Sequence, residues 1–148
     1  MQTSENGIAF IKQNEGFVPH VYDDNGHPAI GYGHDIQGDV PEAWARNGIT
    51  EPSADSLLRA DLSARFEPRL NALIPPGILP TQNQYDALVD FDYNLGGTAL
   101  ATMMHHGWTQ IPTQVPAWCY KHVHGASVKD DGLEARRAKE VALFNTPV

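Results

Sequence analysis

The stretch 15–34 places the strongest constraint on how this chain can fold. It follows an apolar-periodic segment and carries residues of strand character on both sides of a turn at Asn25-Gly26. Asn and Gly tolerate the backbone angles that a tight hairpin turn requires. The sequence therefore predicts a short helix over 4–14, followed by a small antiparallel sheet over 18–36.

Acidic residues stand at both edges of this predicted unit. Glu15 comes at the end of the helix, and Asp23 and Asp24 come directly before the turn. General acid–base cleavage of a glycosidic bond needs two carboxyl groups. A helix end and a neighbouring hairpin can bring two such groups together. Glycosidic cleavage is therefore the first hypothesis for function.

The rest of the chain has a helical pattern. Leucines recur at helical spacing after Thr50, which has the chemistry of an N-cap, and the proline-rich run after Leu73 cannot continue a helix. Further helices are predicted over 81–95, 98–107, about 118–123 and 133–144, with a loop over 125–132.

These elements predict an α+β, mostly helical fold in a single domain of 148 residues. We expect three parts, namely an N-terminal α+β lobe with the antiparallel sheet over 1–50, a connecting helix over 51–74, and a helical C-terminal lobe over 75–148.

The charge of the chain disfavours nucleic acid as a partner. It has 10 Lys and Arg against 18 Asp and Glu, a formal net charge of −8, whereas phosphate neutralisation needs a basic surface. An anionic polymer would need a local basic patch, for which Arg136, Arg137 and Lys139 are the densest candidate.

Other classes of protein find little support in the sequence. The single cysteine, Cys119, excludes an intrachain disulfide, and we expect it to be buried. The N-terminus lacks a secretory signal pattern, and no segment approaches the roughly 18 apolar residues of a membrane span. The histidines lack metal-ligand spacing and no G-x-S-x-G elbow occurs, so no cofactor or metal is expected.

Taken together, the motifs resemble the phage-type lysozymes of glycoside hydrolase family 24, the family of the T-even phage enzyme. The N-terminal signature is carried by Glu15-Gly16, Tyr22-Asp23-Asp24 and Ala29-Ile30-Gly31-Tyr32-Gly33-His34. Later segments that resemble the family are 81–88, 91–96, and Gly132-Leu133 with Arg136-Arg137 and Glu140. The resemblance covers nearly the whole chain and implies a lysozyme-like fold.

This resemblance implies a muramidase, which hydrolyses the β-1,4 bond between N-acetylmuramic acid and N-acetylglucosamine in peptidoglycan. Glu15 matches the general acid, and Asp24, rather than Asp23, matches the second carboxylate, which in this family activates a water and inverts the anomeric centre. Arg136 matches a supporting arginine near the catalytic glutamate.

The resemblance also assigns residues to the substrate cleft. Gly31, Tyr32, His34 and Tyr93 match positions that contact or line it. For His34, pairing with an acid on the connecting helix is an equal alternative.

One position departs from the family pattern. Ala29 stands where the family has a threonine whose hydroxyl is expected to help hold the catalytic water, and alanine has no hydrogen-bonding side chain. Either another group, such as His27 or Asn25, takes over this role, or the chemistry is altered, or activity is weak. Two alternatives therefore stay open: a catalytically impaired module that binds peptidoglycan or a protein, and a lytic transglycosylase that uses Glu15 alone.

The implied context is a phage or prophage endolysin for host lysis. Such a protein would accumulate as a monomer in the bacterial host cytoplasm and reach the cell wall in the periplasm through a membrane-permeabilising, holin-type partner. A bacterial effector delivered by a secretion apparatus is the alternative.

Overall fold

The first helix, α1 (Glu5–Glu15), forms as the sequence predicts. The computed structural model describes residues 1–24 and 26–147. The Ser4 side chain caps the helix by accepting a hydrogen bond from the Gly7 backbone N–H, and Gly16 ends it at a φ of 75°. Ile8 and Ile11 are buried in the core and hold the helix in place. Glu15 is the last residue of this helix.

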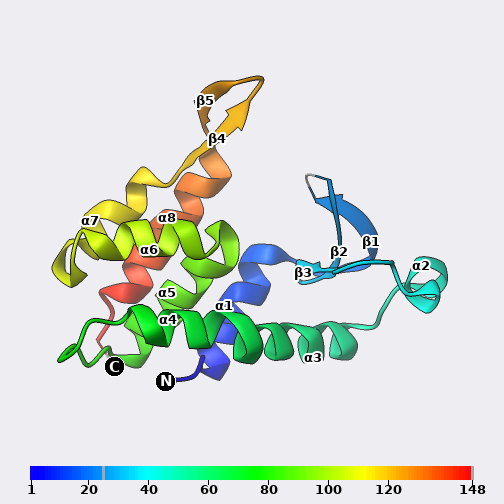
Figure 1. Ribbon diagram of the computed structural model, residues 1–148, viewed down its shortest axis with the longest axis horizontal. Coiled ribbons are helices and arrows are strands. Elements are labelled where there is room, and N and C mark those ends of the chain that lie inside the picture. Colours follow the sequence, from blue (N-terminus) through cyan, green and yellow to red (C-terminus); the bar gives the residue numbers. More distant parts are fainter. Residues whose placement is uncertain (25, 148) are drawn as a thin grey trace.

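A three-stranded antiparallel sheet follows α1, which confirms the predicted hairpin region. Strands β1 (Val18–Asp24), β2 (His27–Gly31) and β3 (His34–Asp35) pair in the order β1-β2-β3. Asp24 pairs with His27, and this is the strand pair next to the residues that connect β1 to β2. Asn25 of the predicted turn lies outside the described residues. A short helix, α2 (Glu42–Asn47), lies beyond the sheet (Figure 1).

Helical structure continues from Glu51 to Leu73, but it is not one regular α-helix. α3 (Glu51–Asp61) and α4 (Glu67–Leu73) are joined by a π-helical turn, η1 (Leu62–Phe66). Pro68 has no backbone N–H and its ring would clash with the carbonyl four residues earlier. The Glu67 N–H donates to Leu62 O, five residues back instead of the four of an α-helix. The helical turn directly before this proline therefore contains one extra residue.

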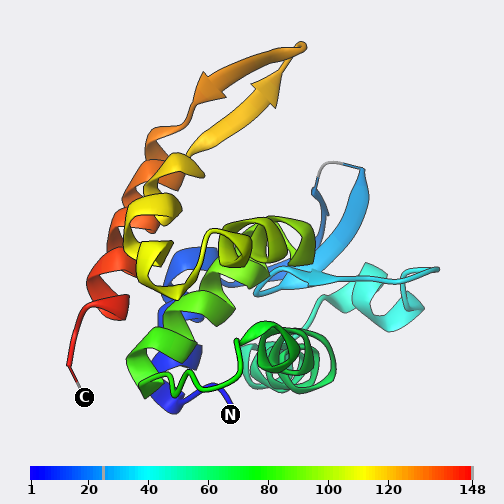
Figure 2. The ribbon, with the colours of Figure 1, turned by 60° about the vertical axis from the view of Figure 1, so that its left-hand side comes forward.

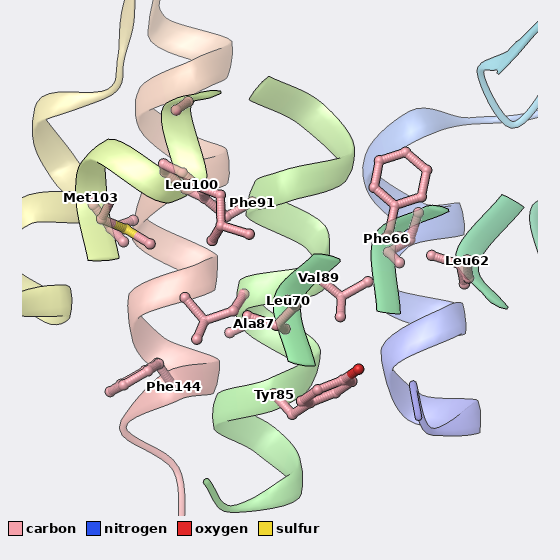
Figure 3. Close-up of a cluster of buried hydrophobic side chains, with 14 of the residues drawn as sticks. Leu62, Phe66, Leu70, Tyr85, Ala87, Val89, Phe91, Leu100, Met103 and Phe144 are labelled. Carbon is pink, nitrogen blue, oxygen red and sulfur yellow. The ribbon is translucent and has the colours of Figure 1, made fainter. Parts of the chain in front are cut away.

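Helix α5 (Gln82–Leu95) lies at the centre of the C-terminal part of the molecule (Figure 1). The side chains labelled in Figure 3 gather around it from η1, α4, α5, α6 and α8, and they belong to one buried apolar cluster. The other helical segments of this part are α6 (Gly97–His105), η2 (Trp108–Gln110), α7 (Ile111–Gln114), η3 (Val115–Ala117) and α8 (Asp131–Phe144).

The prediction of a short helix near 118–123 and a loop after it was wrong. Strands β4 (Tyr120–Val123) and β5 (Ala126–Lys129) form an exposed antiparallel hairpin that projects from the C-terminal helices (Figures 1 and 2). Its two turn residues, His124 and Gly125, have φ values of 49° and 82°. Two successive positive φ angles match the right-handed twist of a hairpin, and this turn chemistry overrode the weak helical pattern.

The predicted fold class is confirmed, because the chain is mostly helical with a small antiparallel sheet near the N-terminus. The division at residues 50 and 74 into lobes and a connecting helix stays a prediction. None of the helices in the described part of the chain is long and apolar enough to cross a membrane.

We predict that Leu70→Ala lowers the free energy of unfolding by about 2–5 kcal/mol, since Leu70 is fully buried in the apolar cluster and its loss leaves a cavity. Urea unfolding measures the effect. The matched control is Leu79→Ala, because Leu79 is 93% exposed and should change stability by less than about 0.5 kcal/mol. Equal effects of the two substitutions would contradict this account of the core.

Candidate active site

Glu15 lies at the end of α1 with its carboxylate largely withdrawn from solvent. Its side chain is 20% exposed, and Glu15 Oε1 lies 2.7 Å from Arg136 Nη1. Gly33 packs against the same carboxyl group: a Cβ at this position would lie 3.4 Å from Glu15 Oε2, and its φ is 81°. A side chain at residue 33 would therefore be strained and would crowd Glu15.

Arg136 also holds Asp90, a fully buried acid on α5. Arg136 Nε and Nη2 donate to the two oxygens of Asp90 at 3.0 and 2.8 Å, a bidentate pairing that fixes the plane of the guanidinium. Asn14 Nδ2 donates to Asp90 Oδ2 at 3.2 Å. The end of α1, the middle of α5 and the start of α8 are thus joined through one side chain.

A second buried pair extends this cluster along α8. Arg137 Nη2 donates to Glu140 Oε1 at 2.5 Å, and both side chains are 1% exposed. Arg136 Nε lies 3.7 Å from the same oxygen of Glu140. The cluster therefore contains three carboxyl groups, those of Glu15, Asp90 and Glu140, and only two guanidinium groups. Full ionisation would leave a buried negative charge, which favours retention of one proton among the three acids.

This arrangement corrects one expectation from the sequence. Arg136 and Arg137 do not form a basic surface patch, since they are 8% and 1% exposed and both are paired with acids. Of the three predicted patch residues, Lys139 alone is exposed. Sequence proximity suggested a patch, but helical geometry turns the two arginines into the protein.

Burial raises the pKa of the Glu15 carboxyl. Arg136 acts in the opposite direction, while the negative charges of Asp90 and Asp24 add to the rise. A carboxyl group that keeps its proton at higher pH is suited to general acid catalysis.

Asp24 provides a contrasting environment at the exposed end of β1. Burial raises the pKa of Tyr22, and the negative charges of Asp24 and Glu15 both add to this rise, so the two candidate carboxylates act on the same side chain. The two candidate carboxyl groups therefore stand in different environments, since Glu15 is partly buried and Asp24 is exposed.

A cleft of about 580 Å³ is bordered by Gly33, which packs against Glu15, and by His27, which pairs with Asp24, although neither acid is itself among its lining residues. Its walls come from the sheet, the π-helical turn and the end of α5, and they include Gly33 and Tyr93. The Tyr93 hydroxyl donates to Tyr32 O at 2.7 Å, and the Tyr93 ring packs against Phe66 with centroids 4.8 Å apart. Tyr93 is thereby fixed as a rigid wall of the cleft.

The other predicted substrate residues have packing contacts instead. Gly31 packs against α3, where a Cβ would lie 2.9 Å from that of Ala54. The Tyr32 side chain is buried and donates to Glu51 at 2.5 Å. Neither residue is part of the cleft wall in the described part of the chain. Their role in substrate binding stays a prediction.

His34 and Ala29 also have defined places. His34 Nδ1 lies 2.7 Å from Asp61 Oδ2 on α3, which is the pairing with the connecting helix that the sequence offered as an alternative. Ala29 is 2% exposed in β2, opposite Tyr22 and Asp35 on the neighbouring strands.

The described residues contain no group of three or more His, Cys, Asp or Glu side chains that could hold a metal ion.

Comparison with known proteins agrees with this geometry. The model of the phage lysozyme family matches residues 12–140. The chain belongs to the phage lysozyme family. It is 36% identical over 146 residues to the endolysin of Salmonella phage P22, covering 97% of this chain and 98% of that protein. It is 37% identical over 155 residues to the endolysin of Bacillus phage PZA, covering 99% of this chain but only 56% of that longer protein.

A solved structure supports the same assignment. The endolysin from Escherichia coli O157:H7 phage FAHEc1 superimposes with a TM-score of 0.84 at 33% sequence identity, covering 100% of this chain and 96% of that one. The similarity therefore extends over the whole fold of this phage lysozyme family member.

Sequence reasoning gave neither Asp90 nor Glu140 a place in the site, although Glu140 is among the residues that resemble the family. Asp90 lies on the buried side of α5, and Glu140 lies four residues after Arg136 on α8. The sequence did contain a signal for Asp90. Asp86 and Asp90 are four residues apart in the helix predicted over 81–95, so they lie on one face of it among apolar residues, where a solvated acid would not be expected.

We predict that the free energy of unfolding falls as pH rises from about 5 to 9, in part because of Glu140. Burial raises the pKa of Glu140 from 4.5 to about 9 in the folded protein, with Asp90 adding to the rise and Arg137 and Arg136 opposing it. Between these two values the folded state binds more protons than the unfolded state, so stability is lost as pH increases. Glu140→Gln should flatten the dependence, as measured by urea unfolding across this range.

The control for this experiment lies on the same helix. Glu134 is 53% exposed and paired with Lys129, so Glu134→Gln should leave the slope of stability against pH unchanged. An unchanged slope in Glu140→Gln as well would show that this proton is not held by Glu140.

Proposed function

We propose that this phage lysozyme family member hydrolyses the β-1,4 bond between N-acetylmuramic acid and N-acetylglucosamine in peptidoglycan. The observation that supports this most directly is the partly buried Glu15 carboxyl. Arg136 fixes it at 2.7 Å, it packs against Gly33 of the cleft wall, and burial raises its pKa. A proton held on such a group can be donated to the glycosidic oxygen as the bond breaks.

Asp24 is the proposed second carboxylate. From its exposed position at the end of β1, its carboxylate would take a proton from a water as that water attacks the anomeric carbon. Attack from the opposite face of the sugar would invert the anomeric configuration. Tyr93 and Gly33 would border the sugar rings in the cleft.

We place this activity in host lysis by a phage or prophage. The relatives named above are phage endolysins. This chain covers 98% of the phage P22 protein and 96% of the phage FAHEc1 protein, but only 56% of the phage PZA protein. In this setting the protein acts as a monomer on the cell wall, and a holin-type partner gives it access from the host cytoplasm to the periplasm.

We predict that Glu15→Gln lowers kcat on purified peptidoglycan by roughly 10²–10⁴-fold, because the amide cannot donate the proton. Release of reducing ends measures activity, and mass spectrometry of the ends identifies the product. The control is Glu5→Gln at the exposed beginning of the same helix, which should retain full activity. Anhydro-muramic ends from the wild type would indicate a lytic transglycosylase instead of a hydrolase.

We predict that Ala29→Thr raises kcat several-fold, because it restores a hydroxyl that can hold the attacking water. Ala29→Val is the matched control: it adds nearly the same volume to this buried position without a hydroxyl. Equal rates in the two variants would show that the hydroxyl is not needed here. A wild type that folds and binds peptidoglycan without cutting it would support a binding module in place of the enzyme.

A further inference from the structure

A group of charged side chains lines the cleft beyond the predicted catalytic pair. Arg65 belongs to the π-helical turn η1, Arg69 to α4, and Asp92 to α5, where it directly precedes Tyr93. These segments lie side by side in the body of the molecule (Figures 1 and 2). None of the three residues has a part in the acid–base chemistry proposed above.

Asp92 leaves a buried acceptor without a partner. The residue is 0% exposed, and its Oδ2 accepts a hydrogen bond from Arg69 Nε at 2.9 Å. Its Oδ1 is also buried, but it has no hydrogen-bond partner among the described residues. Burial raises the pKa of Asp92 even beside Arg69. Buried acceptors of this kind are rare, and a donor on a bound ligand would satisfy this one.

Arg69 is held rigidly next to this acceptor. Its guanidinium lies over the Phe66 ring, 5.0 Å from the centroid, and a Cβ on Gly97 would lie 2.6 Å from Arg69 Cδ. The absence of a side chain at residue 97 therefore makes room for Arg69. Because Nε is used on Asp92, the terminal nitrogens of Arg69 remain for another acceptor.

Arg65 supplies a second guanidinium at the same wall. It lies over the Phe66 ring at 5.6 Å and forms no ion pair in the described part of the chain. The one-residue widening at η1 sets the direction of Arg65 and Phe66 relative to α3. π-Helical turns of this kind are frequent at functional sites.

Two further acids that line the cleft are already engaged. Asp61 pairs with His34 at 2.7 Å, and Asp35 accepts from Gln37. Two guanidinium groups thus face the cleft in a chain whose formal net charge is −8. Paired arginines match the geometry and charge of a carboxylate.

We propose that Arg65, Arg69 and Asp92 form a subsite for a carboxylate with a neighbouring amide N–H on the muramic acid side of the substrate. This proposal rests on the proposed function and specifies the substrate further. The carboxylate binds to the two arginines, and the N–H donates to Asp92 Oδ1. Peptidoglycan offers two sources of this chemistry: the peptide stem, or the lactyl carboxylate of a sugar whose stem has been removed, beside its acetamido group.

The test is Arg65→Gln, which removes one cation from an exposed position and should leave the fold intact. We expect KM on glycan strands to rise about tenfold or more while kcat stays within about twofold, because the interaction is made with the ground state and the transition state alike. The matched control is Arg46→Gln on α2, which removes the same charge from a side chain that is 73% exposed and outside the cleft.

Two substrates distinguish the sources of the carboxylate. A loss confined to stem-bearing strands assigns the subsite to the peptide stem, whereas a loss confined to strands stripped by an amidase assigns it to the lactyl carboxylate. A loss on both shows that either group is accepted. Equal KM values for Arg65→Gln and Arg46→Gln on both substrates overturn the proposal.

A binding measurement separates this proposal from the proposed function. Calorimetry with uncut strands compares Glu15→Gln with Glu15→Gln combined with Arg65→Gln, so catalysis is not needed. A wild type without activity, together with a tenfold weaker Kd in the double variant, would refute the hydrolase and retain the subsite. Unchanged affinity beside an active wild type would refute the subsite alone.

Discussion

The buried contact of Arg136 with Glu15 and Asp90 is the interaction on which the rest of this structure depends. One guanidinium joins the last residue of α1, the middle of α5 and the start of α8. Removing a charge from water is costly, and it is tolerated here because the carboxylates complete a hydrogen-bonded set around the cation. The same contact that joins these helices therefore also fixes the orientation of the Glu15 carboxyl.

The excess of acids over bases in this cluster gives the site its chemistry. Burial raises the pKa of both Glu15 and Glu140, and the negative charge of Asp90 adds to the rise of each. A single arginine next to a single glutamate would lower the pKa of the acid, whereas this cluster raises it. Helix packing and acid strength in this phage lysozyme family member are thus set by one group of side chains.

The cleft next to this cluster is built where the regular backbone is interrupted. Pro68 forces the π-helical turn that carries Arg65 and Phe66, and Gly33 takes a positive φ beside Glu15. The backbone departs from regular helix and strand geometry at these two places, and residues from both of them line the same cleft. Such breaks cost stability, and they persist because the buried core around α5 holds the surrounding elements in place.

The sequence by itself determined the helices with clear caps, the hairpin before Gly31, the family, and Glu15 and Asp24 as the candidate acids. These are local patterns: a Ser4 cap, a Gly-containing turn, and motifs of short spacing. Tertiary structure decided that Arg136 and Arg137 are buried, that Asp90 and Glu140 join them, and that the chain after Trp118 forms a hairpin. Burial and charge pairing depend on segments more than 40 residues apart, such as Asp90 and Arg136, and no local pattern encodes which side chains meet there.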